Sequence, residues 1–202
     1  MRIAFAGTPA VAVPTLQALV AAGHDVAVVI TRPDAPLGRK RVMTPSPVAV
    51  AADALGIPVV KAARLDDNAT AEITAYSVDL GVIVAYGGLV REPLLSAPTH
   101  GWINLHFSLL PLWRGAAPVQ RSLMAGDTST GIAVFQLVAA LDAGDVFASV
   151  EVPVPADATA GEFLDELADR GAPIVANVVG DIEAGTANAV AQSGTPTVAA
   201  KL

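Results

Sequence analysis

The chain has 202 residues, of which 53% are hydrophobic and 15% are charged, and it contains no cysteine. This length is enough for one domain with a substantial core, and the apolar content excludes disordered, collagen-like and coiled-coil proteins. The absence of cysteine excludes a disulfide scaffold, a cysteine nucleophile and a thiolate-ligated metal. The net charge of −7 argues against a surface wholly devoted to nucleic acid, although it allows a local basic patch.

The first thirty residues predict alternating strands and helices. No charged residue lies between Ile3 and Gly23, but Pro9, Pro14 and several polar residues interrupt this run. These interruptions argue against a signal peptide or a membrane span. The pattern instead predicts a strand at 2–6, a tight turn at 7–9, a helix at 11–22 and a strand at 26–30. We therefore expect a soluble, cytoplasmic protein.

The same alternation continues along the chain. Short apolar runs predict strands at 59–60, 80–85 and 102–106, and helices are predicted at 47–55, 67–76 and 92–97. Unbroken apolar strands are typical of a parallel sheet covered by helices on both faces. Two longer strands at 130–138 and 146–152 could pair antiparallel, and a final helix covers 159–183. The predicted fold class is therefore α/β and Rossmann-like, with a mostly parallel sheet flanked by helices.

The chain is expected to form one domain followed by a tail, and its sequence lacks two common nucleotide-binding motifs. Residues 1–183 are expected to form one domain, and 184–202, which are small and polar, a linker or tail. The first loop reads GTPA, without the three glycines of a dinucleotide-binding fingerprint, and no P-loop motif occurs. Gly7 is best explained as a tight turn that lets the helix pack near the strand.

Asn104 and His106 form the first candidate for chemistry. Residues two apart in a strand project from the same face. Both side chains therefore point together at the carboxyl end of the strand at 102–106, where open α/β sheets place ligands. A histidine at a strand end can also be purely structural. Strand geometry by itself leaves both explanations open.

Three motifs decide between these explanations. The chain contains NLHFSLLP at 104–111, WRGAAPVQ at 113–120 and LDAGD at 141–145. This constellation resembles the folate-dependent formyltransferases. Within that family, WRGAAPVQ and the early TRPDAPLGRKRVMTPSPV segment are typical of the members that act on methionyl-tRNA. The resemblance extends from residue 2 to about residue 182.

The resemblance implies an enzyme that transfers a formyl group from 10-formyltetrahydrofolate to the α-amino group of methionyl initiator tRNA, for translation initiation. It places the catalytic trio at Asn104, His106 and Asp142. Asn104 would donate to the oxyanion of the tetrahedral intermediate, and a protonated His106 would stabilise it. Asp142 would raise the pKa of the histidine and take the proton of the amine. Asp145 is the rival carboxylate, and the family pattern assigns Asp142. No metal is expected.

The resemblance also implies two substrate sites. The pterin would lie among small residues that leave main-chain groups accessible. The expected folate-binding residues are Ala85, Tyr86, Gly87, Gly88, Ser108, Leu109, Leu110, Pro111, Ala139, Ala140 and Leu141. A basic loop at 32–41 carries four of the chain's twelve basic residues within ten positions. Such a cluster can be merely a solvated surface, but the family places it on the tRNA acceptor end. The expected tRNA-binding residues are Arg32, Arg39, Lys40, Arg41 and Arg114.

Two departures from the family pattern bear on tRNA binding. Leu112 stands where a basic residue is common. Full members also carry a C-terminal β-barrel domain, and this chain is expected to be the catalytic domain without it, with weakened tRNA binding. We expect a monomer with no membrane partner. The alternatives are a formyltransferase for glycinamide ribonucleotide or a sugar amine, a formyltetrahydrofolate hydrolase, and a non-catalytic ligand-binding module.

Overall fold

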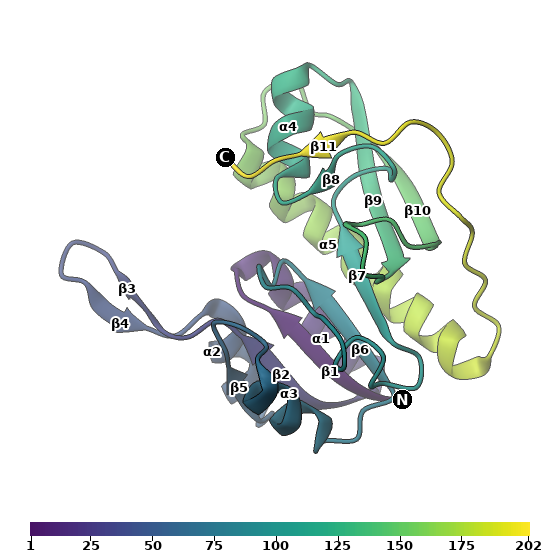
Figure 1. Ribbon diagram of the computed structural model, residues 1–202. Helices are drawn as coiled ribbons and strands as arrows, with labels where there is room; N and C mark the ends of the chain where they lie inside the picture. The colour runs from purple at the N-terminus through teal and green to yellow at the C-terminus, as the bar shows by residue number, and fades with distance from the viewer. The chain divides into compact units, whose positions relative to one another are not determined.

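Apolar runs near the N-terminus form a parallel sheet in the computed structural model, which describes residues 1–202. The chain divides into two units, Met1–Trp102 and Ile103–Leu202, and this sheet belongs to the first unit (Figure 1). Its strands lie in the order β6, β1, β2, β5, and every neighbouring pair is parallel. These strands are β1 (Arg2–Gly7), β2 (Asp25–Thr31), β5 (Val59–Lys61) and β6 (Leu80–Val84).

The helices of the first unit begin at residues suited to that position. Helix α1 (Val13–Ala21) continues a short 3₁₀ turn, Ala10–Ala12, and has proline in its first turn. The Ser46 hydroxyl accepts from the Ala49 amide (3.0 Å) at the start of α2 (Pro47–Ala54). Asp66 does the same for α3 (Asp67–Thr74). Both caps satisfy an amide that the helix itself leaves unpaired.

The turn after β1 depends on Gly7. A Cβ atom there would lie 2.8 Å from the Cβ of Ala12 and 3.0 Å from the carbonyl oxygen of Val84. Because real Cβ atoms do not approach other atoms so closely, only glycine lets the 3₁₀ turn and β6 come this near. The predicted packing role of Gly7 is confirmed.

The basic loop forms a hairpin, which sequence analysis did not predict. Strands β3 (Ala35–Leu37) and β4 (Val42–Thr44) pair antiparallel, with Ala35 opposite Thr44. Figure 1 shows this hairpin projecting away from the other strands of the first unit. The residues at its tip are exposed, as predicted. The segment is therefore an exposed arm with regular pairing rather than an irregular loop.

The helix predicted at 92–97 is wrong. The segment forms turns, with the Leu95 amide donating to the Arg91 carbonyl oxygen at 2.9 Å. Pro93 has no amide to donate, and Pro98 follows five residues later, so there is no room for a helix between them. Leu94 is buried, and its carbonyl accepts from the indole of Trp102 at 2.8 Å.

The second unit contains the antiparallel strands. Strand β9 pairs with β7 on one side and β10 on the other, which confirms the predicted antiparallel pair. Helix α4 and two short strands, β8 and β11, which pair parallel, were not predicted. The expected α/β class is confirmed. The elements are β7 (Trp102–His106), β8 (Arg114–Gly115), α4 (Pro118–Ala125), β9 (Ser129–Gln136), β10 (Val146–Pro153), α5 (Ala160–Ala184) and β11 (Val198–Ala199).

Helix α5 covers one face of β7 and β9. Thr159 and Glu162 form a reciprocal capping box at its start. At Gly171 the helix passes so close to the sheet that an added Cβ would lie 2.9 Å from a methyl group of Leu105 and 3.5 Å from one of Ile132. Leu105 and Ile132 therefore face α5. The side chains next to them in β7 and β9 face the opposite way.

We expect Gly171→Val to reduce the free energy of unfolding by about 1–3 kcal/mol more than Gly180→Val does, because only the first site is overpacked. Both glycines lie in α5, and a Cβ at Gly180 meets nothing within 4 Å. The pair therefore shares the same change in helix propensity, and urea unfolding of both variants isolates the packing cost. Equal destabilisation would contradict the close approach at Gly171.

The residues after α5 run along the second unit. Val190 forms a bridge with Val146, and β11 pairs with β8. The predicted boundary near residue 183 stays a prediction, but the segment beyond it is hydrogen-bonded to the unit before it. None of the helices is both long and apolar enough to cross a membrane.

Candidate active site

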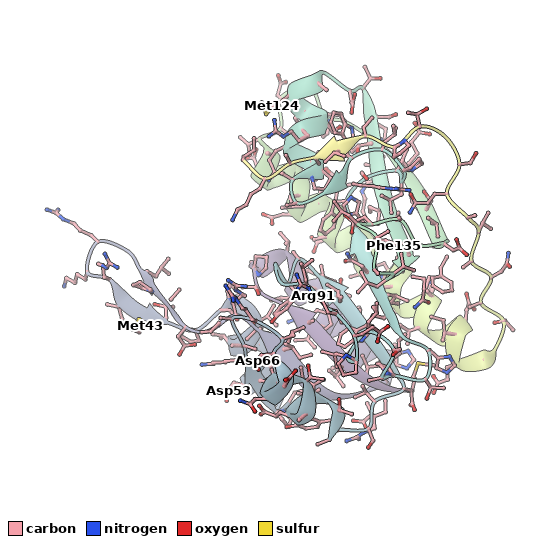
Figure 2. All side chains as sticks on the ribbon, in the orientation of Figure 1. Met43, Asp53, Asp66, Arg91, Met124 and Phe135 are labelled. Carbon is pink, nitrogen blue, oxygen red and sulfur yellow. The ribbon has the colours of Figure 1, made fainter.

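The face of β7 opposite α5 carries the polar candidates. In the pairing of β7 with β9, Asn104 lies opposite Phe135 and His106 opposite Ala133. Residues opposite each other in a sheet share a face, so these four side chains project on the same side. Figure 2 labels Phe135 on its strand. The predicted alignment of Asn104 with His106 is therefore what the backbone produces.

His106 is held by contacts on three sides. Its Nε2 lies 2.9 Å from the carbonyl oxygen of Trp113, and its Nδ1 lies 3.9 Å from Oδ2 of Asp142. The ring of Phe135 meets the imidazole edge-on, with centroids 6.2 Å apart and planes at 87°. The histidine is 5% exposed. Its ring is therefore fixed, with one nitrogen toward a carbonyl and the other toward a carboxylate.

These contacts define the tautomer of the neutral imidazole. A carbonyl oxygen can only accept, so Nε2 carries the proton and Nδ1 keeps its lone pair facing Asp142. Burial lowers the pKa of His106, and this effect exceeds the opposing influences of Asp142 and of the Trp113 carbonyl. Asp142 does act to raise the pKa, as expected, but burial outweighs it. Burial favours the neutral ring.

Asp142 owes its position to an unusual backbone conformation. Its φ is +43°, which residues other than glycine rarely adopt, and its side chain turns inward so that the residue is 8% exposed. The carboxylate accepts from the Gly115 amide at 2.7 Å. Asp145 is exposed, and its carbonyl accepts from the amide of Gln136 at 2.8 Å. Of the two rival carboxylates, Asp142 is the one that lies beside His106.

Trp113 holds the histidine through its backbone carbonyl and was not predicted as a site residue. Its backbone amide donates to the Thr197 hydroxyl, and its indole donates to Asp127, both at 2.8 Å. These bonds fix a residue whose φ is +58° and whose carbonyl contacts His106. The tryptophan belongs to the WRGAAPVQ motif, so a signal existed. Nothing local in the sequence pointed to Thr197 or Asp127.

The first-unit residues expected to bind folate form the turn after β6. Tyr86 is buried, and its hydroxyl donates to the Ala62 carbonyl at 3.1 Å. Burial raises the pKa of this phenol. The Tyr86 carbonyl accepts from Thr8 at 2.9 Å, which joins the turns after β1 and β6. Ala85 and Gly87 are exposed, so this turn leaves main-chain groups accessible. The Tyr86 side chain is instead buried within the first unit.

The second-unit residues expected to bind folate follow β7 and β9. Ser108 is buried, and its hydroxyl donates to the Leu112 carbonyl at 2.5 Å, so it braces its own loop. Pro111 is also buried, whereas Leu109 and Leu110 are half-buried. Ala139, Ala140 and Leu141 are exposed and lead directly into Asp142. The small exposed residues therefore lie next in sequence to the carboxylate.

The basic residues expected to bind tRNA divide into two kinds. Arg39, Lys40 and Arg41 are exposed at the hairpin tip. Arg32 instead donates to the carbonyls of Ala63 (2.8 Å) and Gly87 (3.5 Å), which ties it to the first-unit turn. Arg114 donates to the side chain of Gln192 through Nη2 and Nε, at 2.6 and 3.1 Å. No group of three or more histidines and carboxylates is placed to hold a metal.

Comparison with known proteins gives three findings. A family profile described as formyl transferase matches residues 1–179. The methionyl-tRNA formyltransferase of Clavibacter sepedonicus is 63% identical over 201 residues, which cover 100% of this chain and 66% of that protein. That of Cutibacterium acnes is 58% identical over 187 residues, covering 92% of this chain and 59% of that protein. This chain thus spans about two thirds of the length of such relatives.

A solved structure shares the fold. The glycinamide ribonucleotide transformylase 1 of Symbiobacterium toebii superimposes with a TM-score of 0.77 over 92% of this chain and 88% of that one, at 23% identity. At this identity the likeness concerns the fold alone. It agrees with the α/β arrangement described above.

Proposed function

Because the chain belongs to the formyl transferase family, we propose that it transfers a formyl group from 10-formyltetrahydrofolate to the α-amino group of methionyl initiator tRNA. The observation that carries the proposal is the 63% identity to a methionyl-tRNA formyltransferase across the whole chain. The activity is a proposal because the chain covers 66% of that relative. The reaction serves translation initiation, so we infer a cytoplasmic site of action.

The first chemical step needs a base beside the formyl carbon. The amine attacks that carbon and forms a tetrahedral intermediate with a negative oxygen and a positively charged nitrogen. We propose that Nδ1 of His106, which keeps its lone pair, takes the proton from this nitrogen. Asp142, 3.9 Å away, then stabilises the imidazolium that forms. Burial lowers the pKa of His106, which favours the neutral ring that this step needs.

The second step needs an acid and an oxyanion donor. Collapse of the intermediate breaks the bond between the formyl carbon and N10 of the folate, and the imidazolium returns its proton to N10. The amide of Asn104, on the same face of β7, would donate to the negative oxygen in the meantime. The proton thus moves from the amine to His106 and on to the leaving nitrogen, and the charges balance.

The hairpin is the proposed contact for the tRNA acceptor end. It combines cations at its tip with exposed apolar side chains on its strands, among them Leu37 (66% exposed) and Met43 (61% exposed). Figure 2 labels Met43. Cations neutralise phosphates, and arginine and apolar side chains stack on unpaired bases. The one acid in the cluster, Asp34, is paired with Lys61 at 2.6 Å. Asp34 is therefore paired with a cation outside the hairpin tip.

Arg39→Ala should raise the KM for methionyl initiator tRNA by about tenfold, because it removes one phosphate or base contact, and leave the affinity for folate unchanged. Steady-state kinetics with varied tRNA, together with folate titration followed by fluorescence, measure the two effects. Arg91→Ala is the matched control, since it removes the same charge from an exposed position outside the hairpin. Equal losses in both assays would argue against a tRNA role for Arg39.

One assay separates the proposed reaction from its rivals. The purified protein is incubated with 10-formyltetrahydrofolate and, in separate reactions, methionyl initiator tRNA, glycinamide ribonucleotide, a sugar amine or no acceptor. We expect release of tetrahydrofolate only with the charged tRNA. Turnover without an acceptor would identify a hydrolase, and turnover with another amine would identify a different transferase. No turnover with any acceptor would refute catalysis by this chain.

A further inference from the structure

The segment after α5 reaches the loops that carry the proposed catalytic residues. The amides and carbonyls of Val146 and Val190 bond to each other at 2.8 and 2.9 Å. Further along, Thr197 accepts from the Trp113 amide, and β11 pairs with β8. The segment is thus hydrogen-bonded to the rest of the second unit at residue 190 and again at residues 197–199. Gln192 lies between these anchors.

The side chain of Gln192 uses its whole hydrogen-bonding capacity. Its Nε2 donates to the carbonyl oxygens of Asp142 (2.9 Å) and Gly144 (2.8 Å). Its Oε1 accepts from Nη2 (2.6 Å) and Nε (3.1 Å) of Arg114. A glutamine amide has two N–H groups and two acceptor lone pairs, and all four are used here. A half-buried side chain so fully occupied holds its neighbours in one arrangement.

These bonds complete a ring around the carboxylate of Asp142. Arg114 is followed in the chain by Gly115, whose amide donates to Oδ2 of Asp142. From Asp142 the ring passes along its own backbone to its carbonyl, then through Gln192 back to Arg114. The ring thus fixes both the backbone and the side chain of Asp142. That backbone is in the left-handed region, so it needs such outside support to persist.

The loop around Asp142 combines close backbone packing with polar bonds. An added Cβ at Gly144 would lie 1.8 Å from the carbonyl oxygen of Gln136, so the backbone passes there at close quarters. Leu141, on the other side of Asp142, is 54% exposed and contributes little burial. Gln192 donates to the carbonyls of Asp142 and Gly144, which lie on either side of residue 143. Removing their shared donor takes away the two polar bonds that hold the backbone of this turn.

We propose that Gln192 is a positioning residue that aims the Asp142 carboxylate at His106 by holding the carbonyls of Asp142 and Gly144. The inference rests on the proposed formyl transfer, in which Asp142 stabilises the histidine. Gln192 touches none of the reacting atoms and acts through Asp142. A displacement of about 1 Å in a catalytic group can cost about 100-fold in rate, so the loss of this support is measurable.

Two substitutions separate the hydrogen bonds that Gln192 donates from those that it accepts. Gln192→Glu keeps the shape and still accepts from Arg114, but it can no longer donate to the two carbonyls and repels them. Gln192→Ala removes both sets of bonds. Ser193→Ala is the matched control, because Ser193 is the next residue and is exposed. Thermal unfolding of each variant ensures that folded protein is compared.

The first measurement is independent of catalysis. Hydrogen exchange of the Gly115 amide, followed by ¹H–¹⁵N NMR on the full chain, reports whether Asp142 Oδ2 still accepts from it. We expect exchange to become about tenfold faster in Gln192→Glu and Gln192→Ala and to be unchanged in Ser193→Ala. Unchanged protection of Gly115 in Gln192→Glu would overturn the proposal. This result holds whether or not the protein turns over any acceptor.

The second measurement is kinetic. We expect kcat for formyl transfer to fall by about 10- to 100-fold in both Gln192 variants, with the KM for 10-formyltetrahydrofolate nearly constant. If Gln192→Glu kept the kcat of the unsubstituted protein, the bond to Arg114 alone would matter and the proposal would be wrong. If the unsubstituted protein showed no turnover, the proposed function would fail, while the exchange experiment would still decide the role of Gln192.

Discussion

Replacing His106 by asparagine should lower kcat for formyl transfer by about 10²- to 10⁴-fold, the range typical of a lost general base. The asparagine amide occupies the place of Nδ1 and does not reach the Trp113 carbonyl, which Nε2 of His106 contacts at 2.9 Å. It offers no basic lone pair toward Asp142, so the attacking amine has no acceptor for its proton. Single-turnover kinetics with saturating folate and tRNA measure the chemical step directly.

The control for this substitution is His100→Asn. His100 is exposed and follows the turns after β6, outside the proposed machinery. We expect its variant to retain the activity of the unsubstituted protein. A His106→Asn variant that unfolds normally and keeps kcat within about threefold would remove His106 from the mechanism. In that case the imidazole would be a structural element between Trp113 and Phe135.

Local patterns predicted the elements that depend on local chemistry. The strand predicted at 102–106 has the bounds of β7, because an apolar run follows the Gly101 turn. The segment at 92–97 misled because its apolar spacing suits a helix, while Pro93 and Pro98 prevent one. Helix α4 was missed because the motif that begins it was treated only as a family signature.

The arrangement of the site depends on contacts between distant residues. Gln192 and Asp142 are 50 positions apart, and Trp113 and Thr197 are 84 apart. No periodicity or motif links such pairs, so the sequence could suggest the candidate residues but not their supports. The sequence also could not predict the direction in which the pKa of His106 shifts. Asp142 alone would raise the pKa, and only the depth of burial reverses the direction.

The second large effect is expected at Asp142. Asp142→Asn keeps an oxygen that can accept from the Gly115 amide, so the turn retains its main contact. It removes the negative charge 3.9 Å from Nδ1 of His106, and the imidazolium formed in the reaction loses its counter-ion. We expect kcat to fall by about 10²- to 10³-fold as a result.

The pH dependence gives this substitution a direction as well as a size. The proposed base acts when neutral, so the rate rises with pH through the pKa of His106. Asp142 holds that pKa up against the effect of burial. Without the charge the pKa falls further, and the acid limb of the plot of kcat against pH moves to lower pH in Asp142→Asn, even though the plateau is lower.

Asp145→Asn is the matched control, three residues away and exposed. It removes the same charge from the same turn without touching His106, so both the plateau and the acid limb should stay where they are. The opposite pattern, with Asp145→Asn inactive and Asp142→Asn close to the unsubstituted protein, would transfer the catalytic role to Asp145. An acid limb that moved to higher pH in Asp142→Asn would exclude His106 as the titrating base, because removing a nearby carboxylate can only lower the pKa of a histidine.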